Sequence, residues 1–250
     1  MISVCMATFN GAKYIKLQID SILPQLSADD ELIISDDEST DGTINIITSY
    51  QDARIVLLHH QKDEKLRLQT CASFRFATSN FENAIRRAKG EYIFLSDQDD
   101  VWHPNKVERM VQAMRSSVAV QCNCNVIDDS GNELQAELFP SQPFSANLLY
   151  NIKAMPFLGC CMAFRRDILR WVLPFPKGLL AHDFWIGAIV TQKGKIEYLP
   201  EVLHFYRKHG NNVSPASGGK SANSLIFKIS YRIVFFVQIL KRLGNIFCLL

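Results

Sequence analysis

Two acidic clusters are the residues of this 250-residue sequence whose chemistry is easiest to infer. One contains Asp36 and Asp37, and the other contains Asp97, Asp99 and Asp100. Carboxylates held close together repel one another and raise one another's pKa values, so such a group favours the binding of a cation. Because the ligands are all oxygen atoms, Mg²⁺ or Mn²⁺ is the expected metal, and that metal would in turn bind a diphosphate.

The first cluster also has a purely structural interpretation. The segment from Asp36 to Gly42 could be a turn followed by a helix N-cap, where Asp, Ser and Thr are favoured. The second cluster precedes the apolar pair Val101 and Trp102, and no helix is expected before Pro104. The second cluster is therefore the stronger candidate for a metal site.

Short apolar segments separated by helical patterns should position both clusters. Strands are expected at 2–8, 31–37, 54–59, 91–96 and 118–127, and helices near 10–23, 41–50 and 80–89 and from residue 104. This alternation is typical of an α/β fold with a Rossmann-like, mostly parallel sheet and helices on both faces. Ligands bind beyond the carboxyl ends of such strands, where both clusters fall.

The second half of the chain shows a different pattern. Residues 139–156 are expected to be irregular, 160–164 a short strand, 182–192 a helix, 195–206 a strand broken at Pro200, and the Gly/Ser-rich residues 211–223 a mobile loop. We therefore expect a nucleotide-binding half over residues 1–100 and a second binding surface over 101–220. Residues 221–250 form a separate tail.

Charge is distributed unevenly along the chain. Residues 202–250 contain seven Lys and Arg and no Asp or Glu, whereas the first 201 residues hold 20 basic and 25 acidic side chains, a net charge of −5. The acidic body lacks the basic face typical of a nucleic-acid-binding protein. The basic, apolar tail instead suits an anionic membrane surface. Hydrophobic content of 48% excludes a disordered chain and a small disulfide scaffold.

Cysteine usage and the N-terminus suggest a cytoplasmic protein. The seven cysteines form no CxxC pair, which suggests reduced thiols in a cytosol. The sequence begins directly with a strand pattern and lacks the basic start of a signal peptide.

The sequence lacks the two common glycine-rich phosphate-binding motifs but contains three stretches that resemble a known family. There is no GxGxxG after the first strand and no GxxxxGK[ST], so NAD and P-loop chemistry are disfavoured. The stretches VCMATFNGAKYI, IISDDESTDGT and NFENAIRRAKGEYIFLSDQDDVW resemble the family 2 glycosyltransferases, especially a bacterial branch often described as rhamnosyltransferases. The resemblance extends over residues 1 to about 210. It implies a GT-A fold, a nucleoside-diphosphate sugar, Mg²⁺ or Mn²⁺, and inversion at the anomeric carbon.

The resemblance also implies a nucleotide pocket. Thr8, Phe9 and Asn10 would line it, with Phe9 near the base. Asp37 would accept a hydrogen bond from the imide N–H of uracil or thymine, which suits UDP or dTDP. Residues 60–79 lack the glycine usual in this family and so depart from its pattern, although Asn80 fits the expected asparagine.

The same resemblance implies the metal site. Asp97 and Asp99 match the DxD element, with Asp97 towards the ribose, Asp99 on the metal and Asp100 behind it. The segment beginning at Tyr206 resembles the YRxHxxN motif, so Arg207 is expected near the diphosphate and His209 in the metal shell. A histidine near a strand end can instead be structural. The loop that follows is expected to close over the donor and exclude water.

A catalytic base should come from the second half, because it must lie across the sugar from the metal. The branch carries an acidic base in an HDxW motif, which His182-Asp183-Phe184-Trp185 matches, and Asp183 is the candidate. Asp183 could instead be a helix N-terminal charge stabilised by the dipole. Trp102 and Trp185 are candidates for binding the acceptor sugar, and their alternative is core packing.

The tail has the pattern of an amphipathic helix. Residues 225–243 are mostly apolar, but Lys228, Arg232, Gln238 and Arg242 fall along one helical stripe. These charges disfavour a spanning helix, which needs about 20 apolar residues, and favour a helix lying at the membrane interface. A helix docked on the domain, or a dimer contact, is the alternative.

Together these features predict an inverting glycosyltransferase. Its donor would be a UDP- or dTDP-sugar, including dTDP-L-rhamnose, and its acceptor a hydroxyl of a cell-surface polysaccharide or lipid-linked glycan at the inner face of the bacterial plasma membrane. Two alternatives remain: a non-catalytic homologue that binds nucleotide-sugars, and a sugar-nucleotide pyrophosphorylase. The latter usually carries a Gly-rich, basic phosphate loop, which TFNGAKYI does not supply.

Overall fold

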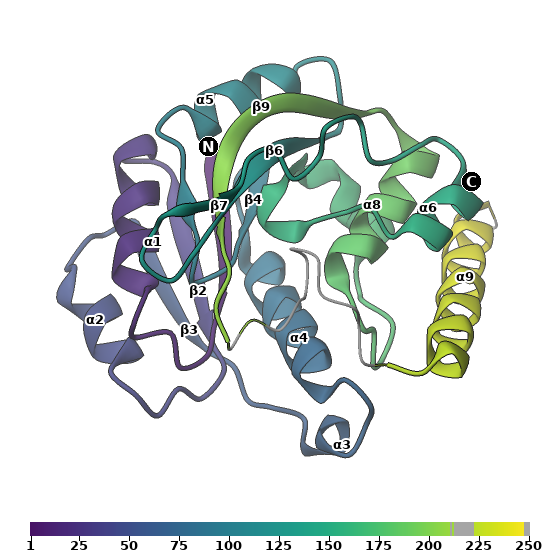
Figure 1. Ribbon diagram of the computed structural model, residues 1–250, viewed down its shortest axis with the longest axis horizontal. Helices are drawn as coiled ribbons and strands as arrows, with labels where there is room; N and C mark the ends of the chain where they lie inside the picture. Colours follow the sequence, from purple (N-terminus) through teal and green to yellow (C-terminus); the bar gives the residue numbers. More distant parts are fainter. Residues whose placement is uncertain (211, 213–222, 248–250) are drawn as a thin grey trace.

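The structure, a computed structural model, describes residues 1–210, 212 and 223–247. Within them a nine-stranded sheet has the order β3-β2-β1-β4-β8-β6-β9-β5, and β7 pairs with β6 (Figure 1). The strands are β1 (Ile2–Thr8), β2 (Glu31–Asp36), β3 (Ile55–His59), β4 (Tyr92–Ser96), β5 (Val101–Trp102), β6 (Ala119–Ile127), β7 (Glu133–Gln135), β8 (Met162–Arg165) and β9 (Ile196–Arg207).

Helices flank the sheet on both sides (Figure 1). They are α1 (Ile15–Ile22), α2 (Thr43–Ser49), α3 (Glu64–Arg67), α4 (Ala72–Arg87), α5 (Lys106–Ala113), α6 (Leu148–Ala154), α7 (Leu169–Val172), α8 (His182–Lys193) and α9 (Leu225–Phe247). Short 3₁₀ turns, η1 (Leu23–Gln25), η2 (Gly159–Cys161) and η3 (Arg166–Ile168), connect some of them.

The sheet is mostly parallel, as expected. Strands β1, β2, β3 and β4 form the parallel first half, and β6 and β9 run in the same direction. Strand β8 lies antiparallel between β4 and β6 and so joins the two halves into one sheet. Strands β5 and β7 are also antiparallel to their neighbours. The α/β class with helices on both faces is confirmed.

Alternation along the buried strands divides the core into two layers. Val4 and Met6 of β1 pack with residues of α1 and α5, whereas Cys5 packs with residues of α4 and α8. Successive residues of a strand point to opposite faces, so a strand buried on both sides is apolar throughout. This double burial leaves the strand ends as the places where polar loops reach the surface.

Several predicted elements differ from the observed ones. Helix α4 begins at Ala72 rather than near residue 80, and α6 lies inside the segment expected to be irregular. Strand β9 continues through Pro200, because a register shift opposite Asn123 lets the pairing resume at Val202. Of the loop expected at 211–223, residues 211 and 213–222 lie outside the described residues.

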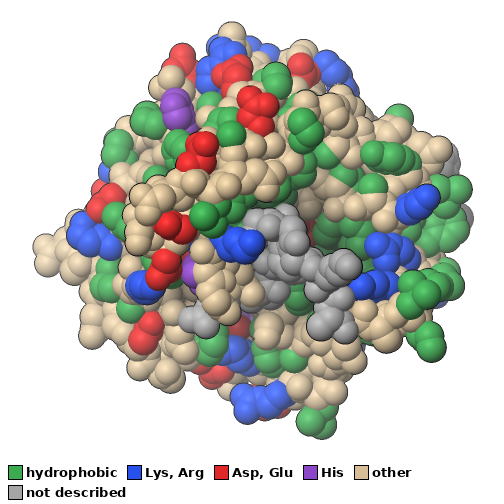
Figure 2. Space-filling view, viewed as in Figure 1, with side chains coloured by type: hydrophobic (Ala, Val, Ile, Leu, Met, Phe, Trp, Pro, Cys, Tyr) green, Lys and Arg blue, Asp and Glu red, His purple; other side chains and the backbone are tan. Residues whose placement is uncertain are grey.

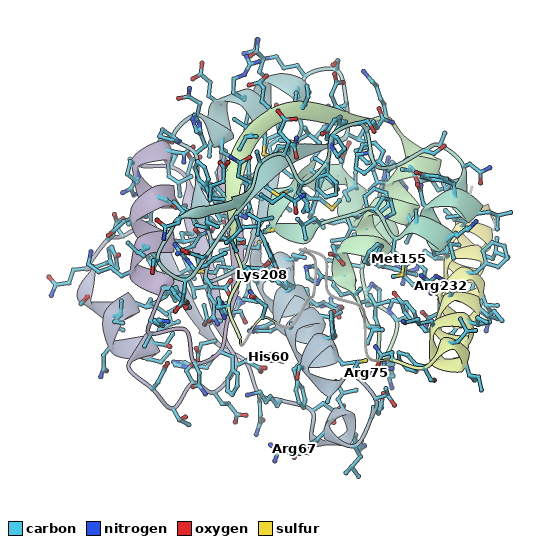
Figure 3. The ribbon with its side chains drawn as sticks, in the orientation of Figure 1. His60, Arg67, Arg75, Met155, Lys208 and Arg232 are labelled. Atoms are coloured by element: carbon cyan, nitrogen blue, oxygen red, sulfur yellow. The ribbon has the colours of Figure 1, made fainter. Side chains whose placement is uncertain are left out.

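Helix α9 packs against the domain, as the alternative interpretation of the tail predicted. Phe235 and Ile239 are buried, and Phe235 contacts Trp185 of α8 edge-on with ring centroids 6.3 Å apart. Arg232 donates hydrogen bonds to the carbonyls of Ile152 and Lys153 at the end of α6, where Figure 3 shows it beside Met155. Within the described residues, every helix falls short of the length and hydropathy that crossing a membrane requires.

Candidate active site

The carboxyl ends of three adjacent strands meet at one edge of the sheet. Thr8 at the end of β1 is in register with Asp36 of β2, and Met6 of β1 is in register with Ser96 of β4. The loops that follow these strands are therefore neighbours, although they are about 30 and 60 residues apart in sequence. This edge is where the ligand of an open α/β sheet binds.

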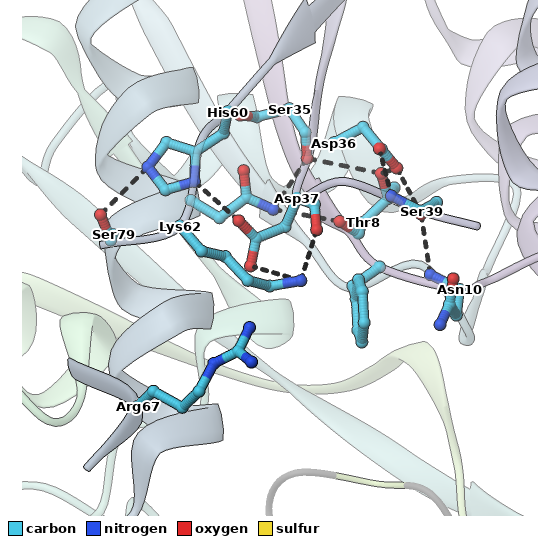
Figure 4. A network of polar contacts seen from close by, with 12 residues as sticks. Thr8, Asn10, Ser35, Asp36, Asp37, Ser39, His60, Lys62, Arg67 and Ser79 are labelled. Carbon is cyan, nitrogen blue, oxygen red and sulfur yellow. Dashed lines mark hydrogen bonds and ion pairs between the residues drawn. The ribbon is translucent and has the colours of Figure 1, made fainter. Parts of the chain in front are cut away.

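Asp37 lies at the centre of a polar network on one side of this edge (Figure 4). Its Oδ1 is 2.8 Å from His60 Nδ1, and its backbone carbonyl accepts a hydrogen bond of 2.6 Å from Lys62 Nζ. Lys62 Nζ also lies 3.4 Å from the centroid of the Phe9 ring. The segment after β3 thus orients Asp37 and Phe9, and Asp37 is only 3% exposed.

The other residues predicted for the nucleotide pocket divide into two kinds. Phe9 and Asn10 are exposed at the edge, and Asn10 accepts a hydrogen bond from the Thr40 amide. Thr8 and Asn80 are buried. The Thr8 hydroxyl donates to Asp36, and the Asn80 amide donates to the carbonyls of Thr8 and Ser35. Thr8 and Asn80 therefore join the ends of β1 and β2, while Phe9 and Asn10 reach the surface.

Gln98 connects this pocket to the second acidic cluster. Its side-chain oxygen accepts from the Phe9 amide at 2.9 Å, and its side-chain nitrogen donates to the Phe9 carbonyl at 3.0 Å. A Cβ at Gly11 would overlap the side-chain amide of Gln98, so a larger residue there would displace Gln98 from its present position. The paired hydrogen bonds hold the Phe9 backbone against the loop after β4.

The second acidic cluster lies on that loop. Burial, followed by the neighbouring charges of Asp100, Asp99 and Asp183, raises the pKa of Asp97 well above its usual range. Burial also raises the pKa of Asp99, although its hydrogen bond to His209 opposes this shift. Asp99 Oδ2 is 2.8 Å from His209 Nε2, so the structure brings these two residues together as expected.

The residues present fit a divalent cation. The half-buried Asp97 and Asp99 carboxylates repel each other and are costly to ionise without added positive charge. A carboxylate and an imidazole are both donors that Mn²⁺ accepts, and carboxylates also suit Mg²⁺. Asp99 and His209 would hold the ion, whereas the ligand atoms of Asp97 lie within 4.8 Å of those of Asp100 and Cys160.

Arg207 differs from the expectation that it reaches the diphosphate. It is 3% exposed, and its guanidinium donates to the backbone carbonyls of Asp99, Asp128 and Asp129. All of these hydrogen bonds are within the protein. In this structure Arg207 supports the acidic loop from behind.

Asp183 occupies the first turn of α8, and burial raises its pKa to about 6. Two backbone amides oppose that shift: the Phe184 N–H donates to Oδ1 at 2.9 Å, and the Gly159 N–H donates to Oδ2 at 3.3 Å. Asp183 is close enough to Asp97 for its charge to raise the Asp97 pKa. A carboxylate with a pKa near the operating pH has the property expected of a general base.

The two tryptophans predicted to bind an acceptor sugar lie in the core. Trp102 is 2% exposed, and Trp185 is fully buried, with its indole N–H donating to the Val172 carbonyl at 2.8 Å. Neither presents a ring face to solvent, so core packing, the alternative interpretation, accounts for both. The expectation that they bind the acceptor is corrected accordingly.

Sequence reasoning missed several residues that organise the site. His60 and Lys62 hold Asp37, Gln98 holds Phe9, and Lys106 and His204 lie beneath the acidic loop. Only Gln98 had a signal, because it lies inside the acidic cluster. The others are distant in sequence from the residues they contact, and no local pattern marks them.

Comparison with known proteins now identifies the family. The model for glycosyl transferase family 2 matches residues 3–173, so the chain belongs to this family and is a glycosyltransferase domain. An uncharacterized glycosyltransferase of Nostoc sp. is 30% identical over 86% of this chain and 68% of its own length. The dTDP-rhamnosyl transferase RfbG of Shigella flexneri is 27% identical over 83% of this chain and 72% of its own length.

Solved structures share the fold. TarS of S. aureus, in complex with UDP-GlcNAc, superposes with a TM-score of 0.66 at 18% identity, covering 94% of this chain and 66% of that one. The mannosyltransferase PcManGT from Pyrobaculum calidifontis, in complex with GDP-Man and Mn²⁺, gives a TM-score of 0.59 at 18% identity, covering 85% and 58%. These similarities confirm the GT-A fold. The chain spans about two thirds of the length of the proteins it matches.

Proposed function

We propose that this chain transfers a sugar, with inversion, from a UDP- or dTDP-sugar to a hydroxyl of a cell-surface polysaccharide or lipid-linked glycan. The carrying observation is that Asp183 accepts a hydrogen bond from the Gly159 amide, and that the ligand atom of the next residue, Cys160, lies within 4.8 Å of those of Asp97 and Asp100. Residues 1–100 would bind the nucleotide and residues 101–220 the acceptor. A non-catalytic homologue would have no need for a carboxylate with a raised pKa at this position.

In the reaction, the Asp183 carboxylate removes the proton from the acceptor hydroxyl while the hydroxyl oxygen attacks the anomeric carbon. The bond to the nucleoside diphosphate breaks on the opposite face, so the configuration inverts and no covalent enzyme intermediate forms. Asp99 and His209 would hold a divalent metal, whose positive charge would neutralise the departing diphosphate. Burial of Asp183 keeps its proton affinity high enough for this role.

The proposed donor class rests on the residues around Asp37. We propose that the base stacks on the exposed Phe9 ring and that its imide N–H donates to Asp37, which suits uracil or thymine. The dTDP-rhamnosyl transferase among the relatives supports dTDP-L-rhamnose as one candidate. UDP-GlcNAc bound to the TarS neighbour supports UDP-sugars as another.

For the acceptor side, we propose that α9 lies against the inner face of the bacterial plasma membrane, which would place the protein in the cytoplasm. Exposed apolar side chains gather along this helix, at the right edge of Figure 2; they include Ile226, Ile229, Ile233, Val237 and Leu240. Their spacing puts them on one helical stripe. The basic residues contribute less than expected, because Arg232 and Arg242 bind carbonyls of the domain.

The test is calorimetric titration of UDP and dTDP, each with and without Mn²⁺, on the wild type and on Asp99→Ala. We expect one nucleotide to bind in a metal-dependent manner and that dependence to disappear in Asp99→Ala. Lys16→Ala, which removes an exposed salt bridge outside the site, is the control. A folded wild-type protein that binds neither nucleotide would overturn the proposal in favour of a fold retained without its chemistry.

A further inference from the structure

A buried ammonium group lies directly beneath the acidic loop. Lys106 is the first residue of α5, and its side chain is fully buried. Its Nζ donates to the Cys160 carbonyl at 2.6 Å and lies 3.0 Å from His204 Nδ1 and 4.3 Å from the centroid of the Trp102 ring. Lysine is rarely buried this completely unless its charge is paired. The proposed sugar-transfer reaction does not use the charge of Lys106.

The contacts of His204 determine which of its nitrogens carries the proton. An ammonium group can only donate, so His204 Nδ1 must accept from Lys106. The proton of the neutral ring is then on Nε2, which lies 2.8 Å from Asp100 Oδ2 and donates to it. Burial, helped by the charge of Lys106, lowers the pKa of His204 to about 4, in agreement with a neutral ring.

This chain of hydrogen bonds ends on a carboxylate that is held from two directions. Asp100 Oδ2 accepts from His204, and Oδ1 accepts from the Arg207 amide at 2.8 Å. Arg207 in turn donates from its Nε to the Asp99 carbonyl at 2.9 Å. The acidic loop is therefore fixed to the end of β9, two residues before His209.

We propose that Lys106 and His204 are positioning residues for the metal site. Through Asp100 they fix the loop against β9, so that Asp99 and His209, which come from different parts of the chain, face the same cation. This inference rests on the proposed metal-dependent function.

Mn²⁺ affinity in the absence of any donor tests the inference directly. His204→Leu and Lys106→Met interrupt the chain of hydrogen bonds, and each should weaken Mn²⁺ binding roughly 10- to 100-fold, the usual effect of residues that orient metal ligands. His204→Gln should stay within about threefold of the wild type, because its amide oxygen can accept from Lys106 while its nitrogen donates to Asp100. Calorimetry and the electron paramagnetic resonance signal of free Mn²⁺ report the affinity.

A core variant on the same helix separates positioning from stability. Met110→Ala removes a fully buried side chain of α5 and should lower the unfolding midpoint while leaving Mn²⁺ affinity unchanged. If His204→Leu does not fold, His204→Asn replaces it, because the shorter amide can accept from Lys106 but falls short of Asp100.

The outcomes distinguish the two proposals. A folded wild-type protein without Mn²⁺ affinity overturns the proposed metal site itself. A wild type that binds Mn²⁺, alongside folded His204→Leu or His204→Asn and Lys106→Met variants of equal affinity, overturns the positioning role alone. Loss of Mn²⁺ binding in a folded His204→Gln or Met110→Ala variant also contradicts the positioning role. The hydrogen bonds from Lys106 through His204 to Asp100 would then not be what determines Mn²⁺ affinity.

Discussion

Replacing Asp183 with Asn should abolish transfer and stabilise the protein at the same time. Burial raises the pKa of this carboxyl from 3.8 to about 6. The folded state therefore holds the proton more tightly than the unfolded state, and the stability present below about pH 4 is lost as the pH rises through 6. A shift of this size corresponds to about 3 kcal/mol, because one pKa unit is worth about 1.4 kcal/mol.

The amide of the Asp183→Asn variant would carry no charge to desolvate, so the variant escapes this loss. We expect the free energy of unfolding of Asp183→Asn to exceed that of the wild type by up to about 3 kcal/mol at pH 7.5. About half of that difference should develop between pH 5 and pH 7.5. Loss of a general base should lower kcat by about 10²- to 10⁴-fold.

Urea denaturation at several pH values, with EDTA present, measures the stability difference, and initial rates of sugar transfer measure kcat. Asp167→Asn, at an exposed carboxylate paired with Arg165, is the matched control and should change neither quantity appreciably. A stability difference that does not grow with pH would refute the burial of a charge as the cause. Transfer at near wild-type rate by Asp183→Asn would remove Asp183 from the role of base.

Three further substitutions test other parts of the site. Gly159→Ala should lower kcat at least several-fold, because its Cβ would lie 3.1 Å from His182 Nε2 and 3.4 Å from Asp183 Cβ. Gly244→Ala, with open space around it, is the control and should leave kcat unchanged. Equal kcat values for the two variants would contradict this reasoning. Lys62→Met should weaken UDP or dTDP binding about 10-fold in calorimetry by releasing Asp37 and Phe9, and an unchanged Kd would show that Lys62 does not shape the pocket. Arg242→Met should lower the free energy of unfolding by about 1–3 kcal/mol and expose α9 to proteolysis, because the hydrogen bonds of Arg242 to the carbonyls of Trp171 and Leu173 are lost. Lys241→Met, at an exposed neighbouring residue, should do neither. Equal cleavage rates for the two variants would count against docking of α9 by Arg242.

The parts of the fold that were predictable are those that local patterns determine. The apolar strands that end at Thr8, Asp36 and Ser96 have a regular pattern of burial, and their polar ends follow from it. Helix α6 was missed because it is short and most of its surroundings are irregular, although Asn147 caps it by accepting from the amides of Leu149 and Tyr150.

The contacts within the site were harder to predict. Motif resemblance brought Asp99 and His209 together, but no periodicity could, because they are 110 residues apart. The burial of Trp102 and Trp185 depends on how α5 and α8 pack against the sheet, and a tryptophan has the same appearance in a sequence whether it is in a core or at a surface. The partners of Asp37 depend on where the segment after β3 returns to the sheet edge.

The attachment of α9 has a consequence for how this protein could meet a surface. Arg232, in the first half of the helix, donates to the Ile152 carbonyl of α6, and Arg242, in its last two turns, donates to the Leu173 carbonyl just after α7. Two such anchors prevent α9 from rotating about its own axis. Its exposed apolar stripe therefore has a fixed orientation relative to Asp183. Adsorption through that stripe would depend little on ionic strength, because hydrocarbon rather than charge makes the contact. It would also set the angle and height at which the active site faces any chain emerging from that surface.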